Sequence, residues 1–99
     1  MTTVIEVAPP TDRQPTGFGH LHLYHHGCEQ VPLIKHRNPL KHQYTLQCVC
    51  SLIIRMPERG PAVEAFELTA IDAQPRTVPS GSYSSSADGE LQVITKGAA

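Results

Sequence analysis

The sequence predicts a small, mainly β domain with one antiparallel sheet of about four to five strands. An α+β domain with one short helix is the alternative. Nine prolines and seven glycines are spread over only 99 residues, which leaves little room for long helices. Residues 43–56 alternate between two faces and are rich in β-branched and aromatic side chains, as strands are. Asp88 and Gly89 supply the positive φ angles of a tight turn, which predicts a hairpin of residues 82–86 and 90–95.

A chain of this length forms one domain at most. We expect a flexible N-terminal arm over residues 1–19, a single β domain over 20–96 and a tail over 97–99. Residues 2–7 alternate weakly, which is typical of a short strand or of an arm that docks on a partner. Residues 8–19 are rich in proline and glycine and predict a loop.

The first strand of the domain is predicted at residues 20–26. Leu21 and Leu23 alternate there with polar side chains, and Gly27 ends the pattern. Residues 28–38 contain one proline and are followed by another, which predicts an irregular connection.

The strongest pattern predicts one long central strand over residues 43–56. Residues 62–73 are ambiguous. Gly60 followed by Pro61 is typical of a helix start, because proline is tolerated at the first helical position. The alternation within residues 66–71 favours a strand instead, and a strand is the interpretation preferred.

Composition and charge exclude several classes of function. The net charge is −1, so the chain as a whole is not a binder of polyanions. No apolar run approaches the roughly 18 residues that a membrane span needs. No basic leader followed by an apolar stretch opens the sequence, so we expect a cytoplasmic protein with reduced thiols.

Residues 20–50 contain all six histidines and all three cysteines of the chain. His25 and Cys28 form one short pair, Cys48 and Cys50 form another, and nineteen residues (29–47) lie between the two pairs. Zinc takes about four ligands from such side chains at tetrahedral angles, and two short pairs supply them economically. The pattern therefore predicts a zinc site.

The spacing between the two pairs resembles that of a zinc ribbon, in which two knuckles on neighbouring hairpins close around one ion. The resemblance covers residues 24–52. The first knuckle has a histidine in place of a cysteine. The second has one residue between its cysteines where two are usual, and it has Ser51 where glycine is expected.

A metal-free interpretation of the cysteines also follows from the sequence. On one continuous strand, Cys48 and Cys50 would point to the same apolar face and act as small core hydrophobes. For both to bind one ion, the chain must turn or bulge near Val49, where no glycine or proline indicates a turn. In an exported protein, Cys28 could instead form a disulfide with either of them.

His20 and His22 form an alternative metal pair, because residues two apart on a strand share a face. A third ligand could come from His26, Cys28 or His42. Three protein ligands leave an open position for water, which is the arrangement of a catalytic zinc.

Lys35, Arg37 and Lys41 form the one basic cluster, which is predicted to lie on a loop and has two histidines and no acidic residue among them. They are candidates for contact with a partner or with nucleic acid, and a solvated loop is the plainer alternative.

These observations predict a non-enzymatic interaction module that is stabilised by a structural zinc. One alternative is a metal-free accessory or structural subunit of a larger assembly, with buried cysteines. Another is a small zinc-dependent hydrolase that uses the His-x-His pair. A protein partner or assembly is expected in the first two cases.

Overall fold

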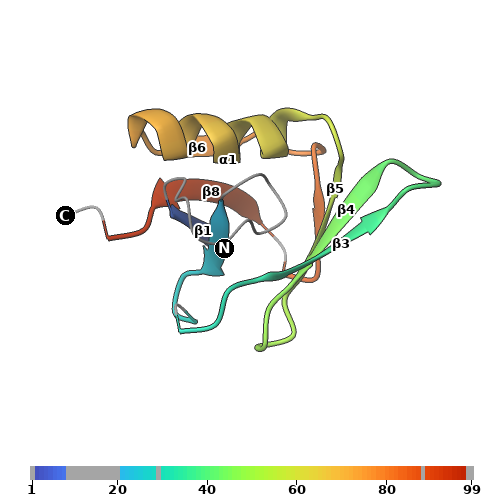
Figure 1. The fold of residues 1–99 in the computed structure, drawn as a ribbon, viewed down its shortest axis with the longest axis horizontal. Coiled ribbons are helices and arrows are strands. Elements are labelled where there is room, and N and C mark those ends of the chain that lie inside the picture. Colours follow the sequence, from blue (N-terminus) through green and yellow to red (C-terminus); the bar gives the residue numbers. More distant parts are fainter. Residues whose placement is uncertain (1, 9–20, 29, 88, 98–99) are drawn as a thin grey trace.

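The computed structural model describes residues 2–8, 21–28, 30–87 and 89–97, which form two four-stranded sheets and one helix (Figure 1). A mainly β fold with one short helix is thus confirmed, with eight strands where about four to five were predicted. The elements in chain order are β1 (Thr2–Ala8), β2 (His22–His25), β3 (Ile34–Asn38), β4 (Gln43–Gln47), β5 (Ile53–Pro57), α1 (Pro61–Asp72), β6 (Arg76–Val78), β7 (Ser84–Ser85) and β8 (Glu90–Thr95).

The first sheet has the strand order β2-β1-β8-β6. Strand β1 lies inside it, antiparallel to β2 and parallel to β8, and its side chains Ile5 and Val7 are fully buried. The predicted arm over residues 1–19 therefore contains a strand of the sheet, and residues 9–20 lie outside the described part of the chain.

The second sheet has the order β3-β4-β5-β7, with antiparallel pairs throughout. The prediction of one long strand over residues 43–56 is wrong, because the chain reverses between β4 and β5 and brings Leu46 opposite Ile54. Both halves alternate with period two, so the pattern alone does not distinguish one long strand from two short ones. The connection over residues 28–38 is also less irregular than predicted, because its last part forms β3.

Helix α1 occupies the segment where a strand was preferred, and that prediction over residues 66–71 is wrong. Gly60 precedes the helix, Pro61 occupies its first turn, and Ala73 ends it in the left-handed conformation. Phe66 and Ala70 alternate as strand residues would, but they are also four apart and so share the buried face of the helix.

The predicted hairpin of residues 82–86 and 90–95 is wrong as well. Strand β7 pairs with β5 in the second sheet, whereas β8 pairs with β1 and β6 in the first. Gly89 does adopt a positive φ of 124°, but there the chain passes from one sheet to the other. Asp88 lies outside the described residues.

One core joins both sheets and the helix. Helix α1 lies along the first sheet, and strands β3, β4 and β5 extend away from it (Figure 1). The largest fully buried side chains come from all three parts and include Phe66, Ile5, Leu46, Ile54, Met56 and Leu91. Within the described residues, no helix is both long enough and apolar enough to cross a membrane.

Candidate metal centre

The predicted pairs of ligands meet where the two sheets join. One ligand atom from each of His25, Cys28, Cys48 and Cys50 lies within 4.8 Å of the others. His25 is the last residue of β2 in the first sheet, and Cys28 follows in the next turn. Cys48 and Cys50 lie in the turn between β4 and β5 of the second sheet. Residues distant in the sequence thus form one cluster.

The first pair lies on a tight turn that glycine makes possible. Gly27 has a φ of 95°, a conformation that side chains with a Cβ atom rarely adopt. The Cys28 N–H donates a hydrogen bond to the His25 carbonyl at 2.8 Å, and the Val31 N–H donates to the Cys28 carbonyl at 3.2 Å. The backbone therefore folds back so that both side chains face the same point.

Strand β1 holds this turn in place through His26. This residue follows the proposed ligand His25 in the sequence, but its own side chain contacts Glu6 of β1. The His26 N–H donates to the Val4 carbonyl at 2.9 Å, and its Nδ1 lies 3.0 Å from Oε1 of Glu6. Glu6 is only 6% exposed. Nothing in the sequence around Glu6 indicates this role, because the contact depends on the pairing of β1 with β2.

The second pair lies on the turn that the sequence did not mark. The Cys48 N–H donates to the Leu52 carbonyl at 2.9 Å, and the Ser51 N–H donates to the Cys48 carbonyl at 3.0 Å. Ser51 has a φ of 78°, so it adopts the backbone conformation for which glycine was expected there. Cys48 is 8% exposed and contributes to the core, whereas Cys50 is exposed. The two cysteines therefore do not share one buried strand face.

The geometry of the cluster fits a tetrahedral ion. At the usual zinc bond lengths, tetrahedral ligands are separated by about 3.5 Å for nitrogen to sulfur and about 3.8 Å for sulfur to sulfur. His25 Nδ1 lies 3.2 Å from Cys50 Sγ, and the whole set lies within 4.8 Å. Small side-chain adjustments would bring all four atoms to bonding distance of one point.

The three thiols of the cluster form no disulfide, and they interact with one another. A hydrogen bond from the Leu52 backbone lowers the pKa of Cys50. The hydrogen bond with Cys48, together with burial, raises the pKa of Cys28 to about 11. A thiolate at Cys50 would therefore accept hydrogen bonds from neighbouring thiols, and a bound divalent cation would take the place of their protons.

No protein-family model matches this chain. No curated protein and no solved structure matches it either. The centre is therefore defined by its own residues and geometry.

The alternative histidine pair does not gather ligands in the described residues. His20 lies outside them. His22 stacks on Tyr24 with ring centroids 6.5 Å apart, and its buried Nδ1 has no hydrogen-bond partner in the described part of the chain. His42 lies in the turn between β3 and β4, with its Nδ1 3.9 Å from a Glu58 carboxylate oxygen. In the part of the chain that is described, the four-residue cluster is the one group that could hold a metal.

The basic cluster lies mostly on a strand, so its predicted placement on a loop is wrong for Lys35 and Arg37, both in β3. Lys41 lies in the turn that follows. Arg37 donates hydrogen bonds to both carboxylate oxygens of Glu58, at 2.9 and 3.2 Å. The Lys35 ammonium lies 4.5 Å from the centroid of the Tyr44 ring.

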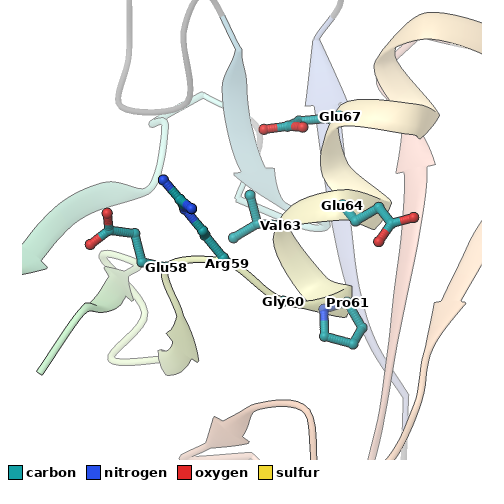
Figure 2. Close-up of a pocket in the computed structure, with 7 residues that line it drawn as sticks. All are labelled: Glu58, Arg59, Gly60, Pro61, Val63, Glu64 and Glu67. Atoms are coloured by element: carbon teal, nitrogen blue, oxygen red, sulfur yellow. The ribbon is translucent and has the colours of Figure 1, made fainter.

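A cavity of about 510 Å³ lies at the start of α1, and three glutamates and an arginine are among its lining residues. In Figure 2 the Glu64 and Glu67 carboxylates point to opposite sides. Acidic groups that hold a metal or move a proton must converge on one point. The lining residues are Glu58, Arg59, Gly60, Pro61, Val63, Glu64 and Glu67. The cavity therefore offers no comparable site.

Proposed function

We propose that the protein is a non-enzymatic interaction module whose fold is stabilised by one zinc ion, held by His25, Cys28, Cys48 and Cys50. The observation that carries the proposal is the approach of these four ligand atoms to within 4.8 Å of one another. Three thiolates and an imidazole are a common ligand set of structural zinc. Thiols stay reduced most readily in the cytoplasm, where we propose that the protein is located.

A structural role is favoured over a catalytic one by the number of ligands. Four protein side chains fill the tetrahedral shell, whereas a catalytic zinc keeps one position for water or substrate. The ion would also join the two sheets, because each sheet supplies one pair of ligands. Linking two sheets is a structural role, and it requires no chemical reaction at the ion.

The ion would decide whether the domain folds. Zinc binding to a structural site contributes on the order of 10–16 kcal/mol, and the net stability of a folded domain is only about 5–15 kcal/mol. A purely apolar role accounts for the buried Cys48 but not for the exposed Cys50 or for the approach of His25. This contrast supports the metal over a core of cysteines alone.

The test is the metal content of protein purified without a histidine tag, measured by elemental mass spectrometry and paired with thermal melting in the presence and absence of a chelator. We expect one zinc per chain and a large fall in melting temperature on chelation. The variant His25→Ala should lose the zinc, whereas His36→Ala, an exposed histidine on β3, should retain it. Protein without metal that melts identically in chelator would contradict the proposal.

A further inference from the structure

Strand β3 presents the longest open strand edge in the described part of the molecule. It lies at the end of the second sheet and pairs there with β4 alone. Among the other end strands, β7 has two residues and β6 has three. The edge of β2 is partly occupied, because the Leu33 N–H donates to the Leu23 carbonyl at 2.8 Å. Every second residue of an antiparallel end strand directs its backbone N–H and C=O away from its partner, where another strand can pair.

Within the described residues, no other element covers the face of this sheet that points away from the core. His36 lies opposite Thr45, which in turn lies opposite Arg55, and none of the three is buried. Ile34, at the start of β3, is 55% exposed although it is a large apolar side chain. A new strand beside β3 would therefore find an apolar contact at one end of the edge.

This part of the molecule is strongly basic. Residues 34–59 contain five lysines and arginines against one glutamate, although the whole chain has a net charge of −1. A cavity of about 700 Å³ after β3 is lined by Arg37, Lys41, His42, Pro57, Glu58 and Arg59. Glu58 compensates Arg37 by their paired hydrogen bonds, so the excess charge comes from the remaining cations. Such a field attracts an acidic partner.

Two other occupants fit less well. A second copy in antiparallel pairing would place Lys35 and Arg37 against the same two cations of the other copy, and like charges directly opposite each other destabilise a strand pair. Single-stranded nucleic acid would find no tyrosine to stack on among the described residues of this outer sheet face, because Tyr44 lies opposite the fully buried Met56 and so belongs to the inner face. Sheets that bind single strands normally present aromatic side chains to the bases.

We propose that the edge of β3 binds an extended acidic segment of a protein partner, which adds a fifth strand to this sheet. Backbone hydrogen bonds would supply affinity, and alternate side chains would supply selectivity. Carboxylates would meet Lys35 of β3 and Lys41 of the turn after it, and an apolar side chain would cover Ile34. The inference rests on the proposed function in one respect: the metal centre fixes Cys28, from which the chain leads into β3.

The test is a titration of the zinc-loaded protein with the peptide acetyl-Glu-Val-Glu-Val-Glu-amide, followed by the NMR signals of the backbone amides. We expect saturable shifts centred on residues 34–38. The same peptide with N-methyl groups on alternate amides should not bind, because it keeps its charge but cannot pair as a strand. The lysine counterpart should not bind either. Shifts confined to the first sheet, or equal binding of the N-methylated peptide, would overturn the proposal.

Two matched variants test the charge. Lys41→Gln removes a cation beside the edge and should weaken peptide binding by about two- to fivefold, the effect of one charge pair between strands. Lys96→Gln removes the same charge after β8 in the first sheet and should leave binding unchanged. Tighter binding of a poly-uridine oligonucleotide than of the peptide would overturn the choice of partner. Metal content is measured on the same samples, so peptide binding without zinc, or zinc without peptide binding, shows which of the two proposals fails.

Discussion

Ser51 adopts a left-handed backbone conformation at the end of the turn that carries two of the four proposed ligands. Its N–H donates to the Cys48 carbonyl, so the conformation is fixed by the turn itself. A residue with a Cβ atom pays roughly 1–2 kcal/mol for this conformation, whereas glycine adopts it readily. The turn therefore carries strain that one substitution can relieve.

We predict that Ser51→Gly stabilises the zinc-loaded protein by about 0.5–1 kcal/mol, because part of the relief is offset by the greater freedom of glycine in the unfolded chain. Urea unfolding at fixed free zinc measures the change. Ser51→Val is the control and should destabilise the protein, since a β-branched side chain tolerates positive φ least. The conformation assigned to Ser51 would be wrong if valine were tolerated as well as glycine.

At this scale the sequence predicted the identity of the four clustered residues, because residue type and spacing are local properties. It did not predict the contact of His26 with Glu6, which exists only when β1 pairs with β2. The metal hypothesis required a turn at residues 48–52. The positive φ within that turn was not predicted, because serine stands at the position where glycine would have indicated it.

Helix α1 is fastened at its end to the start of β6 by an ion pair. Arg76 donates hydrogen bonds to both carboxylate oxygens of Asp72, one of them at 2.7 Å, and also to the Thr69 hydroxyl at 3.3 Å. The hydrogen bond from Arg76 is the main reason why the pKa of Asp72 falls from 3.8 to about 2. The carboxylate form is therefore favoured in the folded state.

The pKa of Asp72 is lower in the folded state than in the unfolded chain, and this fixes the direction in which its contribution to stability changes with pH. The contribution of Asp72 is fully present above its unfolded value near 3.8 and is lost as the pH falls toward 2. We predict that Asp72→Asn lowers the unfolding free energy of the zinc-loaded protein at pH 7, where Asp72 is ionised and the zinc ligands remain deprotonated, as measured by urea unfolding. Glu67→Gln, at an exposed position of the same helix, should change the unfolding free energy much less. Equal unfolding free energies for all three proteins would contradict the assignment.

The elements show where alternation misleads. Residues 66–71 alternate as a strand would, yet the buried face of α1 includes Phe66, Thr69 and Ala70, which are spaced as in a helix. The Gly60-Pro61 start was the better guide, because it depends on backbone chemistry rather than on side-chain pattern. For residues 43–56 the alternation was real, but it holds equally on both sides of a turn.

At the scale of the whole molecule, the ion is expected to link the two sheets and so to couple zinc binding to global stability. A ligand that binds one site in the folded state alone adds about 1.4 kcal/mol of stability for each tenfold rise in its free concentration above the dissociation constant. We predict this slope from urea unfolding in zinc-buffered solutions. His25→Ala should remove the dependence. A slope twice as steep would indicate a second ion, and no slope in the unaltered protein would refute the site.

The sequence alone did not predict which strands pair with one another, and the reason is physical. Positive φ at Gly89 specifies a change of direction, but it does not specify which strands become neighbours. Strand β8 lies between β1 and β6, and Thr2 of β1 pairs with Glu90 of β8 although the two are far apart in the sequence. Pairing between strands so far apart in the sequence depends on the burial of side chains in the common core, and a local sequence pattern does not show this burial.

That parallel pair also sets an order of events during synthesis of the chain. Strands β3, β4 and β5 are joined by short turns and can associate as soon as they leave the ribosome, because local contacts form first. Strand β1 is made before all of them, but its parallel neighbour β8 is made after every other strand of the described residues. Strand β1, with its apolar residues Ile5 and Val7, therefore has at most β2 beside it until β8 has been made.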